Sequence, residues 1–225
     1  MKLKIAPSVL AADITCLGAE IQKIEQAGAD WLHLDMMDGH FVPNFSFSPA
    51  FVKALRPVSQ MFFDVHLMLS EPERYIDAFA KAGADLITVH AEAAGSKEKM
   101  IALAEQIHAH GIKAGISIKP KTPADAIQGV LDKFELILVM SVEPGFGGQF
   151  YIPEVNPKIT ELRKMADREN PAIEIEVDGG ITPDNIAIPV KAGANVLVAG
   201  SAVFQAENPA EAVAALRKHA MEAVN

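Results

Sequence analysis

The spacing of apolar and polar residues changes repeatedly along this chain. Short apolar runs rich in β-branched residues are typical of buried strands, whereas apolar residues that recur every three to four positions are typical of one face of a helix. The first pattern predicts strands at residues 4–9, 31–35, 62–68, 86–90, 113–118, 136–140, 173–177 and 196–199. The second predicts helices at residues 17–27, 74–82, 97–110, 157–168, 183–192 and 210–224. Because strands and helices alternate, the sheet is expected to be parallel.

A short motif recurs along the chain at related spacings. Ala27-Gly28-Ala29-Asp30, Ala82-Gly83-Ala84-Asp85 and Ala192-Gly193-Ala194-Asn195 each follow a helical pattern and precede a strand. The first alanines are 55 residues apart (82 − 27) and then 110 residues apart (192 − 82), which is twice 55. Half of 55 is about the length of one βα module, and eight such modules fill the chain. We therefore expect residues 1–225 to form a single (β/α)8 TIM barrel domain, in preference to an open doubly wound sheet.

Composition narrows the classes of partner. Of the 225 residues, 50% are hydrophobic and 22% are charged, and the formal net charge is −9. Such an acidic chain is a poor candidate for binding nucleic acid or an anionic membrane surface. No apolar run approaches the roughly 18 to 20 residues of a membrane span. Cys16 is the only cysteine, which excludes an internal disulfide and fits a cytoplasmic location.

His33 and Asp35 lie two residues apart within an apolar run. In a strand they share one face, while Leu32, Leu34 and Met36 occupy the other. A buried imidazole beside a buried carboxylate needs compensation, either from each other or from a cation or reaction that uses them. These residues alone leave both interpretations open.

The barrel hypothesis brings further polar residues to the same place, because active sites in this fold lie at the carboxyl ends of the strands. His33, Asp35, His66 and Asp178 are expected to converge there from the second, third and seventh strands. Two imidazoles and two carboxylates suit one divalent metal ion, with Zn²⁺ as the first choice and Fe²⁺, Mn²⁺ or Co²⁺ as alternatives. Asp35 and Asp178 could also reach opposite faces of a flat sugar intermediate, as a proton-transferring pair requires.

Glycine pairs and methionines follow several of the predicted strands. Gly147-Gly148, Gly179-Gly180 and Gly200-Ser201 could bind a phosphate through backbone N–H groups, although each could equally be a tight turn. Three methionines near strand ends could form an apolar wall that excludes water, or could simply fill the core: Met37, Met68 and Met140.

The remaining histidines are interpreted as non-ligands. His108, His110 and His219 fall in helical patterns, His40 lies in a loop, and His90 has no evident partner two positions later. Asp38 and Asp64 are predicted to contact the candidate metal ligands and fix their orientation.

Taken together, motifs from the first strand to the eighth resemble those of the ribulose-phosphate 3-epimerase family: Ile5-Ala6-Pro7-Ser8, His33-Leu34-Asp35-Met36-Met37-Asp38-Gly39-His40, Asp64-Val65-His66-Leu67-Met68, Glu143-Pro144-Gly145-Phe146-Gly147-Gly148-Gln149, Glu176-Val177-Asp178-Gly179-Gly180 and Ala199-Gly200-Ser201. The chain departs from the family pattern at Ala91 and at Lys119, both of which are expected to lie beside the site.

The resemblance implies a ribulose-phosphate-binding barrel that interconverts D-ribulose 5-phosphate and D-xylulose 5-phosphate through a metal-stabilised 2,3-enediolate. It implies that His33, Asp35, His66 and Asp178 bind the metal and that Asp35 and Asp178 exchange the C3 proton. It further implies that Ser8 and His66 contact the sugar. The expected phosphate-end residues are Gly145, Phe146, Gly147, Gly148, Gly179, Gly180, Gly200 and Ser201. Association into a homo-oligomer is compatible with such a barrel.

Three alternatives remain. A D-allulose-6-phosphate 3-epimerase would use the same constellation, but Gly180 and Ser201 favour the five-carbon substrate. A related decarboxylase or aldolase would need a lysine between aspartates, and neither residues 35–38 nor residues 64–67 contain one. A catalytically silent sugar-phosphate sensor would not need two facing carboxylates.

Overall fold

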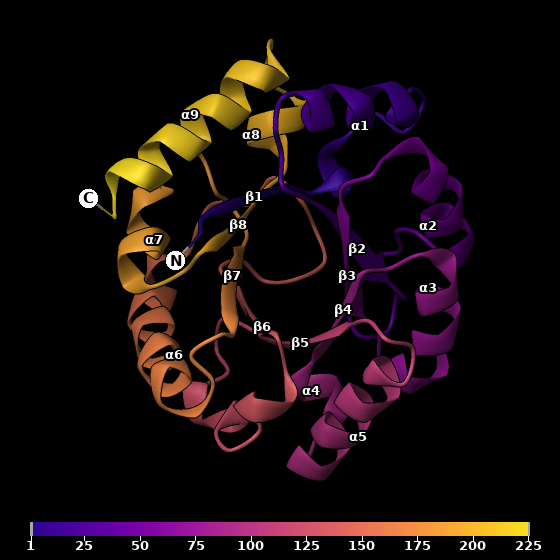
Figure 1. The fold of residues 1–225 in the computed structure, drawn as a ribbon, viewed down its shortest axis with the longest axis vertical. Helices are drawn as coiled ribbons and strands as arrows, with labels where there is room; N and C mark the ends of the chain where they lie inside the picture. Colours follow the sequence, from indigo (N-terminus) through magenta and orange to yellow (C-terminus); the bar gives the residue numbers. More distant parts are fainter. Residues whose placement is uncertain (1, 225) are drawn as a thin grey trace.

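The computed structural model describes residues 2–224 and shows eight parallel strands surrounded by helices (Figure 1). The strands are β1 (Lys4–Pro7), β2 (Trp31–Met37), β3 (Phe62–Met68), β4 (Leu86–His90), β5 (Lys113–Ile118), β6 (Leu136–Met140), β7 (Glu174–Asp178) and β8 (Val196–Ala199). Hydrogen-bonded ladders run in the order β1-β8-β7-β6-β5-β4-β3-β2, and a single parallel bridge between Ser8 and His33 joins the two ends. The predicted TIM barrel architecture is therefore confirmed.

The outer ring consists of α1 (Leu17–Gln26), α2 (Pro49–Leu55), α3 (Ile76–Ala82), α4 (Ala91–Ala94), α5 (Lys97–His108), α6 (Asn156–Glu169), α7 (Ala187–Ala192), α8 (Ser201–Phe204) and α9 (Pro209–Glu222). In α1 the buried residues Leu17, Ile21 and Ile24 form one stripe that packs on the sheet. The side chain of Asn208 caps α9 by accepting hydrogen bonds from the N–H groups of Ala210 and Glu211. None of the helices within residues 2–224 is long and apolar enough to cross a membrane.

The boundaries differ from the sequence prediction in a few places. Strand β1 ends at Pro7, β2 continues to Met37, and β7 begins at Glu174 and includes Asp178. Helix α7 begins only at Ala187 because the side chain of Asn185 accepts a hydrogen bond from the N–H of Thr182 and donates one to the carbonyl of Gly180. These side-chain bonds stabilise a turn where helical periodicity predicted a helix.

The strands separate two apolar layers. Leu32, Leu34 and Met36 face the helices, as their alternation predicted, and belong to the large core between sheet and helices. A second cluster, which includes Trp31, Leu138 and Val196, packs separately from it. A buried polar group lies on the other face of the sheet instead. It consists of His33 from β2, Asp64 and His66 from β3, and Glu176 from β7. The fold thus places charged side chains together where an apolar core would otherwise continue.

Candidate active site

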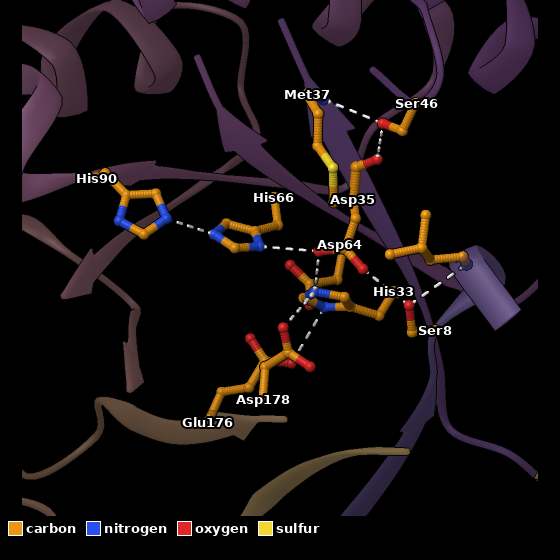
Figure 2. A network of polar contacts seen from close by, with 11 residues as sticks. Ser8, His33, Asp35, Met37, Ser46, Asp64, His66, His90, Glu176 and Asp178 are labelled. Atoms are coloured by element: carbon orange, nitrogen blue, oxygen red, sulfur yellow. Dashed lines mark hydrogen bonds and ion pairs between the residues drawn. The ribbon is translucent and has the colours of Figure 1, made fainter. Parts of the chain in front are cut away.

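A cavity of about 380 Å³ receives residues from the carboxyl ends of the strands. Ser8, Asp35 and Asp178 line it, and so do the glycine segments predicted to bind phosphate, residues 145–148, 179–180 and 200–201. His33 and His66 are fully buried and reach the cavity through their contacts with Asp35 (Figure 2). The structure thus brings together all the residues that the sequence proposed for one site.

His33 is held by carboxyl groups around its ring. Its Nδ1 atom lies 2.6 Å from Oδ2 of Asp64, and its Nε2 atom lies 3.2 Å from Oδ1 of Asp35 and 3.9 Å from Oδ2 of Asp178. With Nδ1 bonded to Asp64, Nε2 is the ring nitrogen that faces the other two carboxyl groups and could ligate a cation beside them. The prediction that Asp64 contacts a candidate ligand and fixes its orientation agrees with this geometry.

Asp35 is the centre of the constellation. Its Oδ1 atom lies 3.0 Å from Nδ1 of His66 as well as 3.2 Å from Nε2 of His33, and its Oδ2 atom accepts a hydrogen bond of 2.8 Å from Ser8 Oγ. Ser8 directly follows β1, so this bond ties the point where the barrel closes to the floor of the cavity. The register that pairs Asp35 with His66 across β2 and β3 sets their spacing.

The geometry of these four residues fits a divalent cation. One ligand atom from each of His33, Asp35, His66 and Asp178 lies within 4.8 Å of the corresponding atoms of the other three. Two ring nitrogens and two carboxylate oxygens are donors that zinc and neighbouring transition metals accept, whereas magnesium and calcium prefer oxygen alone. The cluster can therefore hold one divalent metal ion.

The two cavity-facing carboxyl groups have opposite electrostatic environments. Burial disfavours the charge on Asp35, but the charge and hydrogen bonds of His33 and His66 outweigh burial and hold the pKa of Asp35 below its ordinary value. With the protein groups alone, burial and then the charge of Asp35 raise the pKa of Asp178 to about 7. Burial by itself would lower the pKa of His33. The charges of Asp35, Asp64 and Glu176 outweigh burial and raise this pKa well above its ordinary value.

Glu176 is a buried member of the cluster to which the sequence pattern assigned no role. Its Oε1 atom lies 3.5 Å from Nδ1 of His33, and neither of its carboxyl oxygens has a hydrogen-bond partner by ordinary criteria among the described residues. Burial, followed by the charge of Asp64, raises the pKa of Glu176 well above its ordinary value. Glu176 precedes Asp178 by two positions on β7, so the alternation that identified His33 and Asp35 could have revealed it.

The interpretation of His90 needs a correction. Glu92 does stand two positions after His90, and its Oε2 atom lies 3.1 Å from Nδ1 of His90. The other ring nitrogen, Nε2, lies 2.9 Å from Nε2 of His66, so His90 joins the site although it is not among the four candidate ligands. Burial is the main reason that the pKa of His90 is lowered to about 4, and His90 is therefore neutral near pH 7.

Two other expectations changed in detail. Asp38 does not contact a candidate ligand: its carboxylate accepts hydrogen bonds from the backbone N–H groups of His40, Phe41 and Ser70 and thereby organises the loops after β2 and β3. His110 lies in the turn after α5 and not on the helix.

The glycine segments lie on the side of the cavity formed by β6, β7 and β8. The carbonyl of Gly179 accepts a hydrogen bond of 2.8 Å from Ser141 Oγ, and that of Gly180 accepts one of 2.7 Å from Asn185 Nδ2. Gly180 has a φ of +66°, and a Cβ atom there would lie 2.2 Å from the backbone nitrogen of Tyr151. Only glycine allows the loops after β6 and β7 to approach each other this closely.

Met37, Met68 and Met140 line the same cavity, and each is at most 5% exposed. Met37 and Met68 pack with Val42, while Met140 belongs to the smaller apolar cluster with Leu138. The three side chains thus pack against apolar neighbours and also present an apolar surface to the cavity, and the exclusion of water by that surface stays a prediction.

Comparison with known proteins agrees with this geometry. The model of the "Ribulose-phosphate 3 epimerase family" matches residues 4–204. The chain is 53% identical over 213 residues to a ribulose-phosphate 3-epimerase of Synechocystis sp., a match that covers 95% of this chain and 92% of that protein. It is 48% identical over 216 residues to a ribulose-phosphate 3-epimerase of Bacillus subtilis, covering 96% and 98% of the two chains.

Solved structures with lower sequence identity share the fold. A 3-hexulose-6-phosphate synthase superposes with a TM-score of 0.69 at 21% identity and covers 97% of this chain and 99% of its own. A Streptococcus mutans protein named KGPDC superposes with a TM-score of 0.72 at 14% identity over the full length of both chains. The family match and the close sequence relatives, together with a barrel whose polar motifs meet in one cavity, show that the chain is an enzyme that belongs to the ribulose-phosphate 3-epimerase family.

Proposed function

We propose that this chain interconverts D-ribulose 5-phosphate and D-xylulose 5-phosphate, with Asp35 and Asp178 as the acid/base pair that removes a proton from C3 on one face and delivers one on the other. The observation that carries the proposal is the placement of these carboxyl groups. They come from β2 and β7, face the same cavity, and have oxygens within 4.8 Å of each other. One carboxylate removes the C3 proton, and the other delivers a proton to the opposite face of the planar carbon.

His33, Asp35, His66 and Asp178 would hold one divalent ion, with Zn²⁺ proposed first and Fe²⁺, Mn²⁺ or Co²⁺ as alternatives. When bound, such an ion supplies Lewis acidity next to the sugar oxygens, which stabilises the negative charge of the enediolate. Ser8 donates a hydrogen bond to Asp35 and lies beside the sugar position. Met37, Met68 and Met140 keep water away from the reacting carbon without offering it a hydrogen bond.

The other end of the substrate would bind the glycine segments. The carbonyls of Gly179 and Gly180 are occupied by Ser141 and Asn185, and among residues 2–224 the N–H groups of Gly147, Gly148, Gly179 and Gly180 donate to no backbone or side-chain acceptor. Backbone N–H groups from converging loops form an anion site without a lysine. Gly145, Phe146, Gly200 and Ser201 complete this end of the cavity.

Deuterium exchange tests the proton transfer. With D-ribulose 5-phosphate in D2O, each molecule of D-xylulose 5-phosphate formed should carry solvent deuterium at C3, as measured by loss of the C3 proton signal in the NMR spectrum. Product that retains the original C3 hydrogen would contradict a mechanism in which one carboxyl group removes that hydrogen and the other delivers a different one. Removing metal with a chelator should abolish turnover, and adding back single metals should identify the active ion. Full turnover by a verified metal-free sample would refute the metal assignment.

Rates on two substrates test the sugar length. The five-carbon ketose phosphate should be turned over with a higher kcat/KM than D-allulose 6-phosphate. A preference for the six-carbon substrate would instead support the sister activity.

A further inference from the structure

His66 makes different contacts through its two ring nitrogens. Its Nδ1 atom lies 3.0 Å from Oδ1 of Asp35, and its Nε2 atom lies 2.9 Å from Nε2 of His90 (Figure 2). Both rings are fully buried, so neither can exchange this partner for solvent. Two ring nitrogens at hydrogen-bond distance share one hydrogen, which belongs either to His66 or to His90.

Glu92 decides where that hydrogen resides. Its Oε2 atom lies 3.1 Å from Nδ1 of His90, while its Oε1 atom accepts a hydrogen bond of 2.8 Å from the N–H of Lys119 and another from Thr122 Oγ1. A carboxylate surrounded by donors acts only as an acceptor, so Nδ1 of His90 carries a hydrogen. Neutral His90 then has a lone pair on Nε2 and accepts from Nε2–H of His66.

The surroundings hold this arrangement rigidly. The ring of Phe41 packs against His90 with a centroid distance of 4.7 Å, and the Nζ atom of Lys119 lies 3.9 Å from the centre of the Phe41 ring. The Nζ atom of Lys158 donates hydrogen bonds of 2.7 to 2.8 Å to the carbonyls of Lys119, Pro120 and Thr122. The loop that supplies two donors to Glu92 is thereby tied to α6.

From this geometry we infer that His90 and Glu92 are positioning residues that hold a hydrogen on Nε2 of His66 and so leave Nδ1, beside Asp35, as its metal-ligating nitrogen. In the chain alone Nδ1 donates a hydrogen to Asp35, and a divalent ion shared with that carboxylate would take the place of this hydrogen. The role in metal binding rests on the proposed function, whereas the hydrogen on Nε2 of His66 is a property of the chain that can be measured by itself.

Two measurements test the inference. In the zinc-loaded protein labelled with ¹⁵N-histidine, two-bond ¹H–¹⁵N correlation spectra should show His66 with its hydrogen on Nε2. In competition with a chromophoric chelator, His90→Phe, which keeps an aromatic ring against Phe41 but removes both nitrogens, should lower Zn²⁺ affinity about 10- to 100-fold. His90→Gln retains an amide oxygen that can accept from His66 and should recover most of that loss.

The control is Ser117→Ala. Ser117 is buried on β5, is paired in register with His90, and its hydroxyl has no hydrogen-bond partner among the described residues. This variant should bind zinc as the unmodified chain does, and thermal unfolding of all variants verifies that they are folded. Glu92→Gln serves as a second variant if His90→Phe does not fold, and it should weaken zinc binding in the same direction.

A His66 signal that shows no hydrogen on Nε2 would overturn the inference. So would equal zinc affinities for His90→Phe and His90→Gln, because a purely structural role for the ring does not predict rescue by an acceptor. If the chain epimerises without metal and binds no zinc, the proposed metal role fails, and a metal-free His66 that carries no hydrogen on Nε2 would still overturn the inference.

Discussion

The two sides of the cavity use different parts of the polypeptide. On the side of β2, β3 and β4, buried side chains contact one another in a continuous series from Ser8 through Asp35 and His66 to His90. On the side of β6, β7 and β8, glycine-rich loops line the cavity, and their carbonyls are bonded to the side chains of Ser141 and Asn185.

In the proposed function the two sides accommodate opposite charges, which would account for this difference. A cation needs lone pairs at fixed distances, which buried imidazole and carboxylate groups provide. An anion needs converging N–H groups, which the backbone provides where no side chain intervenes. An acidic chain with a net charge of −9 can in this way bind a phosphorylated sugar without a basic surface. The two sides should accordingly respond differently to substitution.

The largest effect is expected where the two sides meet, at Asp35 and Asp178. Replacing either by asparagine removes a proton-transfer group and should lower turnover at least about 10³-fold, as measured by initial rates. Metal content should separate the variants. Asp35 contacts both His33 and His66 at 3.0 to 3.2 Å, whereas Asp178 contacts His33 only at 3.9 Å, so Asp35→Asn should lose more metal.

Proton exchange sharpens this test. A variant that keeps one carboxylate can still remove the C3 proton from one epimer, so it should exchange that hydrogen with D2O without forming product. If a fully metallated Asp35→Asn or Asp178→Asn enzyme retained more than about a tenth of wild-type turnover, the two-carboxylate mechanism would be wrong.

An intermediate effect is expected on the glycine side, at Gly180. An alanine there would bring its Cβ within 2.2 Å of the Tyr151 nitrogen and would adopt a φ of +66°. We expect Gly180→Ala to lower the free energy of unfolding by about 1 to 3 kcal/mol and to raise KM with a smaller change in kcat, because the loops proposed to bind the phosphate must separate. Urea unfolding and steady-state kinetics measure the two effects.

Gly129→Ala is the matched control for backbone strain. Gly129 has a φ of +79°, a Cβ atom placed on it would have no neighbouring atom within 4 Å, and it does not line the cavity. Its substitution should lower stability by about 1 kcal/mol and leave KM unchanged. Equal changes in KM for both variants would show that Gly180 has no special relation to the phosphate end.

The strand pattern predicted the fold and the central residues because both depend on local periodicity. His33 and Asp35 share a strand face by their spacing alone, and the repeated Ala-Gly motif at residues 27, 82 and 192 indicated the number of modules. The three glycines of this motif do adopt positive φ values, from +83° to +116°. Parallel register then placed His66 beside Asp35, which is a consequence of the barrel topology.

Contacts that depend on packing between distant segments could not be predicted in this way. Glu92 lies in α4, outside the strand pattern, and its bond to His90 matters only because β4 pairs with β3 and brings His90 to His66. The start of α7 was misplaced because Asn185 bonds to Gly180, a side-chain contact that helical periodicity does not register. Side-chain hydrogen bonds between loops therefore account for most of what the sequence left open.

The smallest effect is expected at Glu92, which contacts His90, the last residue of the series that begins at Ser8. Burial opposes the charge on this carboxyl group, but the hydrogen bond from His90 and the donors from Lys119 and Thr122 outweigh it and lower the pKa of Glu92 to about 2 from an ordinary 4.5. A carboxyl group whose pKa is lower in the folded state stabilises that state above its unfolded pKa, and this contribution disappears as the pH falls from about 4.5 towards about 2.

Because Glu92 is partly exposed to solvent, its contribution near pH 7 should be only about 1 to 2 kcal/mol. Urea unfolding in the presence of a chelator should therefore show Glu92→Gln less stable than the unmodified chain near neutral pH. The difference in unfolding free energy should shrink steadily below about pH 4.5, because protonation of the Glu92 carboxylate removes its contribution to the stability of the folded state. Glu143→Gln, at an exposed glutamate that pairs with Lys121, controls for the loss of one surface charge. If the difference in unfolding free energy did not depend on pH, the Glu92 side chain would stabilise the loop by packing and not by its charge. The charged hydrogen-bond partners of the site would then not extend beyond His90.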